Sequence, residues 1–220
     1  MNNSIILVSG GMDSCVAAAI ADSKGENMSF LHINYGQLTE AKELDSFNKI
    51  ADHYSIDNRL IVDISHLKKI GGSCLTDSDI QVPNANLDSI DIPISYVPFR
   101  NANILSIATS WAEVIDASLI YIGAVEEDSS GYPDCRREFY DAFEKCISTG
   151  TKPNTEIKIS TPLINLSKTE IVQKGVELNA PLNLTWSCYK SNVIPCMKCD
   201  SCSLRKRGFD NAQINDPILI

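Results

Sequence analysis

The chain lacks the features that mark a membrane or secreted protein. Its longest apolar stretch, Cys15 to Ala21, is far shorter than the roughly 20 residues that a membrane-spanning helix needs. Its first residues, Met1 to Ser4, carry no basic group, and no long apolar segment follows them, so no secretory signal is visible. We therefore expect a soluble, cytoplasmic protein with no membrane partner, in which disulfides are disfavoured.

Positive charge is also scarce. The chain has 19 Lys and Arg against 28 Asp and Glu, a net charge of −9. Nucleic-acid binding draws on clustered positive charge, so we expect small-molecule substrates and no nucleic-acid partner. The basic residues 205–207 are predicted to complement the C-terminal end of a short helix or to face a nucleotide locally. None of the three histidines lies in a motif, and we assign no histidine base.

Two common phosphate-binding motifs are absent as well. No lysine follows Gly10 or Gly11 as a Walker loop requires, and no Gly-x-Gly-x-x-Gly fingerprint is present. Instead, residues 9–14 read Ser-Gly-Gly-Met-Asp-Ser, between an apolar run at 5–8 and a helix-like run at 15–21. A glycine turn between a strand and a helix leaves backbone N–H groups pointing at one spot, next to the positive end of the helix dipole. This hexad predicts an anion site, most simply for phosphate; the alternative is an ordinary glycine-serine turn.

Strand-like apolar runs alternate with stretches of helical periodicity along the chain. This alternation predicts an α/β fold with a doubly wound, mostly parallel, Rossmann-like sheet, in which ligands bind beyond the carboxyl ends of the strands. The stretch 65–93 breaks the pattern and is predicted to be an insertion or mobile loop over the site, with disorder as the alternative. The strand-like runs are 5–8, 28–33, 59–63, 119–123 and 157–161, and the helical stripes lie within 41–54, 104–115 and 139–147.

Four of the eight cysteines lie close together near the C-terminus, in the pattern C-x7-C-x2-C-x2-C. Four thiolates complete a tetrahedral shell around zinc and leave no open position, so we predict one structural zinc ion per chain. An iron–sulfur cluster is the main alternative, and independent buried thiols are a weaker one. We predict two units: a nucleotide-binding domain at 1–185 and a zinc-binding segment at 186–220 packed on it. The predicted ligands are Cys188, Cys196, Cys199 and Cys202.

The hexad resembles the pyrophosphate loop of the ATP pyrophosphatase superfamily, whose members attack ATP at its α-phosphate. Together, the hexad and the cysteine set resemble the QueC family of 7-cyano-7-deazaguanine synthases. The resemblance extends over nearly the whole chain. Further matching stretches are Tyr-Gly-Gln at 35–37, Val-Pro-Phe-Arg-Asn at 97–101, Ser-Gly-Tyr-Pro-Asp-Cys-Arg at 130–136, Thr-Pro-Leu at 161–163, Lys-Thr-Glu at 168–170, Trp-Ser-Cys-Tyr at 186–189 and Leu-Arg-Lys-Arg-Gly at 204–208.

The resemblance implies an ATP-dependent carbon–nitrogen ligase of queuosine biosynthesis. Its substrates would be ATP with Mg²⁺, ammonia and 7-carboxy-7-deazaguanine, its product would be the nitrile, and it suggests a homodimer. Asp13 and Lys168 are the predicted catalytic residues; Asp13 could instead cap a helix, and a lysine or arginine is often only a solvated surface charge. The predicted ATP-binding residues are Val8, Ser9, Gly10, Gly11, Met12, Asp13, Ser14, Arg100 and Lys168, and the predicted substrate-binding residues are Asp128, Ser130, Tyr132 and Asp134, for which a simple turn at 131–133 is the alternative.

The chain departs from the family pattern at three places. Met12 stands where many members have Gln, Phe99 stands where they have Gly, and Glu-Asp-Ser at 127–129 stands where they have Thr-Asp-Phe. Met12 is expected to contribute only its backbone N–H, whereas the bulk of Phe99 could reshape the base pocket. Three other functions stay open on the sequence: a tRNA thiolase, which the net charge disfavours, a ligase for another carboxylate or base, and a regulator that binds nucleotide without turnover.

Overall fold

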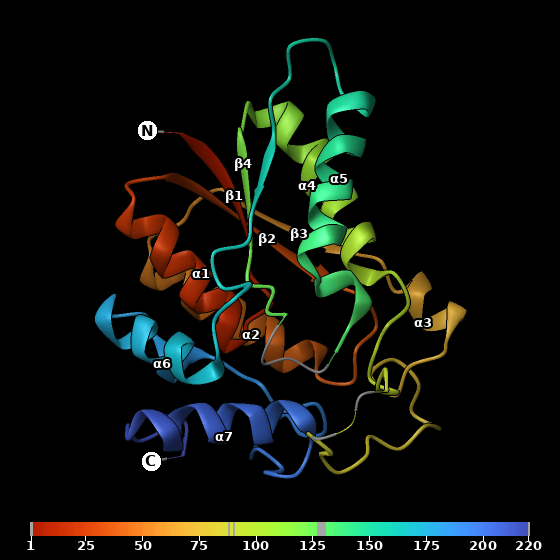
Figure 1. Cartoon of the computed structure of the whole chain (residues 1–220), viewed down its shortest axis with the longest axis vertical. Coiled ribbons are helices and arrows are strands. Elements are labelled where there is room, and N and C mark those ends of the chain that lie inside the picture. Colours follow the sequence, from red (N-terminus) through yellow and green to blue (C-terminus); the bar gives the residue numbers. More distant parts are fainter. Residues whose placement is uncertain (1, 88, 90, 127–130, 220) are drawn as a thin grey trace.

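The computed structural model describes residues 2–87, 89, 91–126 and 131–219. In this part of the chain, five parallel strands form one sheet in the order β3-β2-β1-β4-β5 (Figure 1). All the predicted strands are confirmed, with small shifts at their ends. They are β1 (Asn3–Leu7), β2 (Asn27–Asn34), β3 (Arg59–Asp63), β4 (Leu119–Ile122) and β5 (Lys158–Ser160).

Helices cover both faces of this sheet (Figure 1), so the predicted doubly wound α/β fold is confirmed. Successive side chains of a strand point to opposite faces of the sheet. Ile6 packs with residues of α1 and α2, whereas its neighbour Ile5 packs with residues of α4 and α5. These helices are α1 (Met12–Ser23), α2 (Glu40–His53), α4 (Arg100–Ile115) and α5 (Arg137–Gly150), and the last three contain the predicted helical stripes.

The strand order reverses direction between β1 and β4, which lie side by side at the centre of the sheet. In doubly wound sheets such a switch point leaves a crevice beyond the carboxyl ends of the two strands. Gly123 follows β4 at this place, where an added Cβ would lie 2.7 Å from the carbonyl carbon of Asp13. The absence of a side chain therefore lets the first turn of α1 approach the end of β4.

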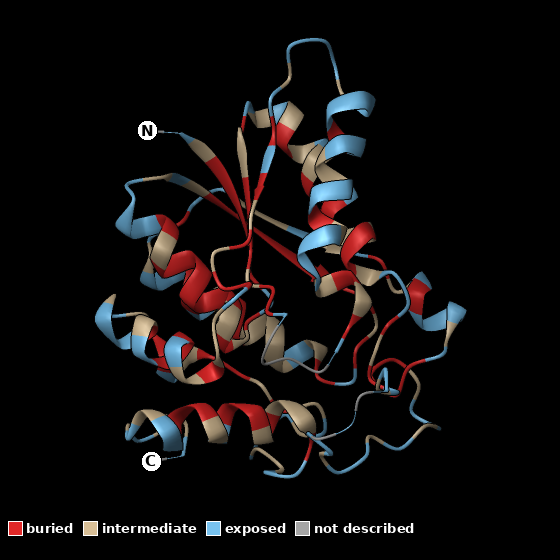
Figure 2. Cartoon of the chain, viewed as in Figure 1, coloured by how far each residue is buried: buried red, intermediate tan, exposed pale blue. Residues whose placement is uncertain are grey.

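The C-terminal part of the chain adds two helices, α6 (Lys168–Glu177) and α7 (Asp200–Ala212), which pack on each other beside α1 (Figure 1). Figure 2 shows that α7 turns a buried stripe toward the body, and Phe209 on this stripe joins an apolar cluster with Met12 and Ile171. Residues 205–207 lie inside α7, so their predicted place at the C-terminal end of a short helix is wrong. The remaining short elements are α3 (His66–Ile70), η1 (Pro133–Cys135) and η2 (Leu182–Leu184).

The stretch 65–93 is in part a structural element rather than a mobile loop over the site. Residues 73–76 within it are buried, and Leu75 accepts a backbone hydrogen bond from Leu38 at 2.9 Å. Farther along, the backbone N–H of Ala85 donates to Lys198 at 2.7 Å. The stretch therefore links the sheet to the cysteine-rich segment. Among the described residues, no helix is long and apolar enough to cross a membrane.

Candidate active site and cysteine cluster

The hexad forms the predicted turn between β1 and α1. Gly10 has a φ of +88°, and an added Cβ would lie 2.4 Å from the backbone carbonyl oxygen of Glu43 in α2, so no other residue fits there. On its other side, the Gly10 carbonyl accepts a hydrogen bond from the backbone N–H of Trp186 at 2.8 Å. The turn is thus held between α2 and the start of the C-terminal segment.

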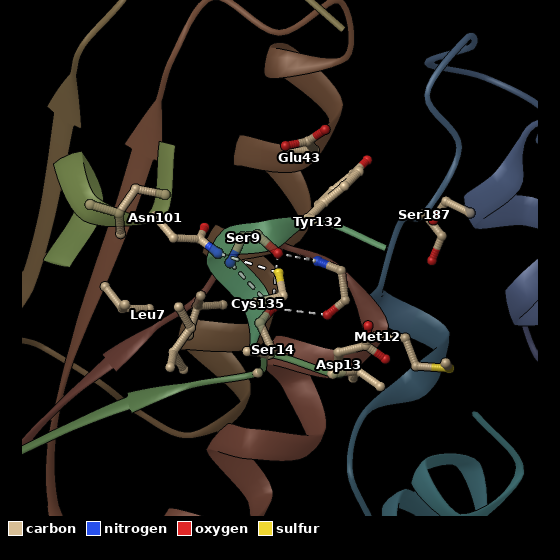
Figure 3. A pocket seen from close by; sticks show the side chains of 18 of the residues that line it. Leu7, Ser9, Met12, Asp13, Ser14, Glu43, Asn101, Tyr132, Cys135 and Ser187 are labelled. Atoms are coloured by element: carbon tan, nitrogen blue, oxygen red, sulfur yellow. Dashed lines mark hydrogen bonds between the residues drawn. The ribbon is translucent and has the colours of Figure 1, made fainter. Parts of the chain in front are cut away.

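The two serines of the hexad brace the turn (Figure 3). The Ser14 hydroxyl accepts from the backbone N–H of Ser9 at 3.2 Å and donates to the Gly11 carbonyl at 3.0 Å, while Ser9 Oγ accepts from the Gly11 N–H at 3.2 Å. Gly11 is the N-cap of α1, and no side chain caps this helix end. The first N–H groups of α1 are therefore open to a ligand, as an anion site requires.

Asp13 and Lys168 meet at the mouth of this turn, although 155 residues separate them in the sequence. The Lys168 ammonium lies 2.6 Å from Asp13 Oδ2, and the lysine is buried. The other carboxylate oxygen, Oδ1, is buried without a hydrogen-bond partner among the described residues. Asp13 lies within the first turn of α1 and does not act as its N-cap. The pair places one cation and one unsatisfied anionic oxygen beside the hexad.

A cavity of about 280 Å³ opens beyond the carboxyl ends of β1 and β4. Its floor is apolar and includes Leu7, Ile122 and Val125, while the hexad, Lys168 and Arg205 provide its polar wall. Most of the predicted nucleotide-binding residues line it together. They are Val8, Ser9, Gly11, Met12, Asp13, Ser14, Arg100 and Lys168, whereas Gly10 shapes the turn without lining the cavity.

Another part of the cavity wall is aromatic. The Arg100 guanidinium donates to the Tyr35 hydroxyl at 3.3 Å and lies 5.1 Å from the Tyr35 ring and 5.9 Å from the Tyr132 ring. The Tyr132 hydroxyl in turn donates to Ser95 Oγ at 2.9 Å, and burial raises the pKa of this tyrosine. Of the predicted substrate-binding residues, Tyr132 is therefore in the cavity wall.

Asp134 lies elsewhere. Its Oδ2 accepts the backbone N–H of Asn101 at 2.9 Å, and the Asn101 side chain donates back to the Asp134 carbonyl at 2.8 Å. Asp134 is buried, does not line the cavity and holds the first turn of α4, and burial raises the pKa of its carboxyl. Asp128 and Ser130 lie outside the described residues. A role for these three carboxyl and hydroxyl groups in reading the substrate stays a prediction.

The structure also brings Glu43 into the cavity wall, a residue for which the sequence analysis predicted no role. Its carboxylate accepts the Thr39 hydroxyl at 2.6 Å and the Gln37 side-chain amide at 3.0 Å. Burial raises the pKa of this carboxyl, and the two hydrogen bonds oppose that rise. The Tyr-Gly-Gln motif just before α2 was the signal that could have pointed to it.

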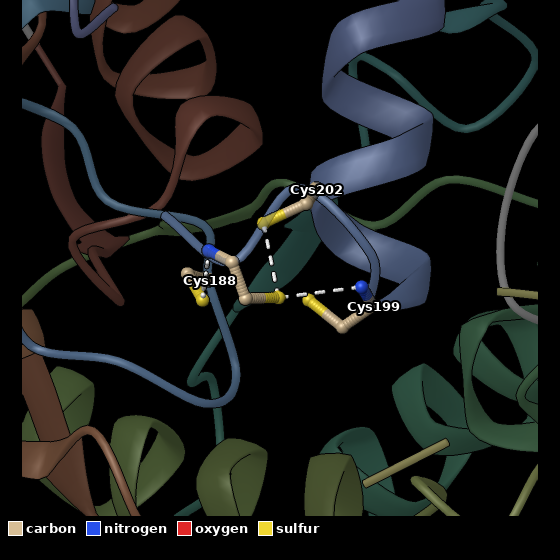
Figure 4. Close-up of side chains that lie close together, drawn as sticks. Cys188, Cys199 and Cys202 are labelled. Atoms are coloured by element: carbon tan, nitrogen blue, oxygen red, sulfur yellow. Dashed lines mark hydrogen bonds between the residues drawn. The ribbon is translucent and has the colours of Figure 1, made fainter. Parts of the chain in front are cut away.

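The four predicted metal ligands converge on one point (Figure 4). The sulfur atoms of Cys188, Cys196, Cys199 and Cys202 all lie within 4.8 Å of one another. A tetrahedral zinc ion with Zn–S bonds of about 2.3 Å holds its sulfurs roughly 3.8 Å apart, so this spacing fits a metal ion.

Backbone donors support the thiolate form of this cluster. The N–H groups of Cys196 and Lys190 point at Cys188 Sγ at 3.3 and 3.4 Å, and that of Cys199 points at Cys196 Sγ at 3.4 Å. Cys199 and Cys202 also lie at the N-terminal end of α7, where the helix dipole favours negative charge. The residues present therefore fit a bound cation.

Comparison with known proteins places the chain in a family. A family model described as "Queuosine biosynthesis protein QueC" matches residues 3–213. The chain belongs to the QueC family. It is 58% identical over 214 residues to the 7-cyano-7-deazaguanine synthase of Chlorobium phaeobacteroides, covering 97% of this chain and 95% of that protein. The enzyme of the same name from Chlorobaculum tepidum is also 58% identical, over 97% of this chain and 94% of its own length.

Solved structures with the same fold are much more distant. NMN synthetase from Francisella tularensis superposes with a TM-score of 0.52 at 15% identity, covering 99% of this chain and 76% of that one. A predicted subunit of tRNA methyltransferase from Methanocaldococcus jannaschii gives a TM-score of 0.54 at 14% identity, covering 80% and 75%. These similarities concern the fold alone. The family match does not favour the thiolase or regulator that the sequence left open.

Proposed function

We propose that this QueC-family protein converts 7-carboxy-7-deazaguanine and ammonia to 7-cyano-7-deazaguanine in an ATP-dependent reaction. The observation that carries this proposal is the 58% identity to enzymes of that name over 97% of the chain. The cavity adds physical support, because it combines a turn suited to anions with a recessed space for a small substrate.

The hexad is suited to the phosphates of ATP. Its open N–H groups at the start of α1 provide donors, the two serines hold the turn in shape, and Lys168 and Arg100 provide positive charge from two other elements. Because the donors are fixed before any ligand arrives, they can stabilise charge that develops on the phosphates without further reorganisation. We assign nucleotide binding to Val8 and the hexad together with these two cations.

The chemistry requires activation of a poor electrophile. A carboxylate does not lose oxide to ammonia, but transfer of an adenylyl group onto its oxygen creates a good leaving group, and ammonia can then form the amide. Dehydration of the amide to the nitrile needs a second activation of oxygen, again with ATP. The buried Lys168 would hold the α-phosphate of the transferred adenylyl group, and the recessed position of the cavity would limit attack by water.

Two metal ions accompany this proposal. Asp13 could bind Mg²⁺ through its unsatisfied Oδ1, and such an ion would neutralise phosphate charge when bound. The four cysteines would hold a structural zinc ion, which fits their sulfur-only donor set better than magnesium does. We further propose a cytoplasmic location, a homodimer, no nucleic-acid partner, and a domain boundary between residues 185 and 186.

The proposal is tested by incubating the purified protein with ATP, Mg²⁺, ammonium and 7-carboxy-7-deazaguanine and following the products by mass spectrometry. We expect the nitrile to appear, and Lys168→Met to lower its rate by about 100-fold or more, as loss of a preorganised cation does. Lys174→Met is the matched control, since this lysine lies on the same helix and pairs only with Glu177 among the described residues.

Three results would count against the proposal. Turnover of ATP only with a different carboxylate would keep the ligase chemistry and change the substrate. No turnover in any mixture would favour a nucleotide-binding regulator. Equal activity of the two lysine variants would remove Lys168 from the active site.

A further inference from the structure

The Tyr-Gly-Gln motif at 35–37 has a visible structural task. The Gln37 side chain accepts the backbone N–H of Tyr35 at 2.8 Å through its oxygen and donates to Glu43 Oε2 at 3.0 Å through its nitrogen. Thr39 donates to the other carboxylate oxygen, Oε1, at 2.6 Å. Gln37, held by Tyr35, and Thr39 therefore fix the Glu43 carboxylate in the cavity wall.

The two hydrogen bonds leave part of the acceptor capacity of the carboxylate unused. Each carboxylate oxygen has about two acceptor sites, and one on each oxygen is used by Gln37 or Thr39. The remaining acceptor capacity is available to a ligand, because Glu43 lines the cavity. In Figure 3, the Glu43 side chain stands well apart from Asp13, while the Glu43 backbone packs against Gly10 of the hexad.

We infer that Glu43 is the specificity-determining residue that recognises the 2-amino-pyrimidinone edge of the substrate base. This inference rests on the proposed function, which supplies a guanine-like substrate. That edge presents a ring N–H and an amino N–H side by side, and a carboxylate can accept both at once. Among the described residues that line the cavity, the carboxylates are Asp13 and Glu43, and Asp13 is paired with Lys168.

Arg100, which we also assign to the phosphates of ATP, completes the pattern, because its guanidinium carries five N–H donors and can serve a phosphate and the base together. The ring carbonyl of the base lies next to the ring N–H, so a cationic donor is needed beside the carboxylate. Arg100 and Glu43 both act electrostatically on the Tyr35 hydroxyl, yet no ion pair joins the two charges in the part of the chain that the structure describes. The Arg100 guanidinium contacts tyrosine rings instead. Both charged groups are therefore held close to each other and are available to a ligand.

Asp134 was predicted from the sequence to bind the substrate, but the structure places it differently from Glu43. Its Oδ2 is occupied by the first turn of α4, and it does not line the cavity. Its other oxygen, Oδ1, is buried without a hydrogen-bond partner among the described residues and does not face the cavity lining. Glu43 provides the same chemical group within the wall itself.

The test compares two ligands by isothermal titration calorimetry: 7-carboxy-7-deazaguanine and its analogue without the 2-amino group. The wild-type protein should prefer the amino compound by between about 10- and 100-fold, since one hydrogen bond to a charged group is worth that much. Glu43→Gln should remove most of this preference. Thr39→Val, which keeps the carboxylate but deletes one of its supports, should reduce it in part.

Glu40→Gln is the matched control, because Glu40 lies in the same first turn of α2 and does not line the cavity. It should leave the preference unchanged, and circular dichroism should show all variants folded. The inference is overturned if Glu43→Gln weakens both ligands equally, or if it raises the KM for ATP and leaves the preference intact.

Turnover measured on the same samples separates this inference from the proposed function. If the nitrile forms but Glu43→Gln keeps the preference, the inference fails and the function stands. If no nitrile forms while Glu43→Gln abolishes a clear preference, the function fails and the recognition of the base edge stands.

Discussion

The sheet region and the C-terminal segment 186–220 are stabilised in different ways. Around the sheet, strand residues such as Ile5, Ile6 and Ile120 are completely buried between two layers of helices. In the C-terminal segment, the large buried apolar side chains are Trp186, Leu204 and Phe209, and the cysteine cluster and a buried pair of charges lie beside them. Apolar burial is distributed over many residues, whereas a metal site or an ion pair depends on each partner.

The buried charges are Arg205 and Asp216. Arg205 Nε and Nη2 donate to the two carboxylate oxygens of Asp216 at 2.7 and 2.8 Å, and Nη1 donates to Thr185 Oγ1 at 2.7 Å. Because Trp186 binds the carbonyl of Gly10, this cluster of contacts leads directly to the phosphate turn. The C-terminal segment therefore helps to hold the turn at 9–14, and damage to it should alter the cavity.

Loss of one cysteine ligand should have the largest effect. Structural zinc sites are worth about 10–16 kcal/mol in zinc-finger peptides, so we expect Cys199→Ser to release the metal and open the C-terminal segment. Metal content, and tryptic cleavage after Lys190 and Lys198, would measure this. The sheet should keep its hydrogen-exchange protection, because its core lies elsewhere.

The exposed Cys146 provides the control. Cys146→Ser should change the free energy of unfolding by less than about 0.5 kcal/mol. If Cys199→Ser unfolded the sheet as well, the two regions would form one cooperative unit.

The next largest effect is expected for the buried ion pair. Asp216→Asn removes one charge and leaves Arg205 uncompensated, which should cost about 3–5 kcal/mol in the free energy of unfolding. Asp210→Asn on α7 breaks an exposed pair with Lys206 and should cost at most about 1 kcal/mol. Urea denaturation of both variants measures the difference. Equal losses in the free energy of unfolding would mean that the buried pair stabilises the fold no more than the exposed pair does.

A smaller effect should arise where the two regions touch. An added Cβ at Gly208 in α7 would lie 2.9 Å from the backbone oxygen of Lys168 and 3.0 Å from its Cβ. Gly208→Ala should therefore cost about 1–3 kcal/mol in stability and lower kcat by about 10- to 100-fold by displacing the Lys168 ammonium.

Gly175→Ala is the comparison for this variant. It also adds a methyl group to a helix contact, but its nearest neighbour is the side-chain atom Cγ2 of Val16 at 3.0 Å, which can move. We expect the two variants to lose similar amounts of stability, and only Gly208→Ala to lose kcat. A loss of kcat in both would assign the effect to general loosening of the helices.

Local patterns predicted much of the fold. The apolar run at 28–33 became β2, which is buried over most of its length, and the run at 59–63 became the partly exposed edge strand β3. The start of α6 was missed, although Ser167 and Glu170 form a capping box that is readable in the sequence. The prediction that residues 205–207 lie at the C-terminal end of a helix was wrong, because charge alone does not show that Arg205 is buried against Asp216.

The sequence by itself determined the elements whose residues are neighbours: the phosphate turn at 9–14 and the cysteine spacing at 188–202 both act over short distances along the chain. Only the tertiary structure decided which distant groups share a cavity. Asp13 pairs with Lys168, Glu43 joins the wall, and Asp134 turns away to hold α4. The reason is that packing of whole helices on a sheet, and not local preference, sets distances between residues that are far apart in sequence.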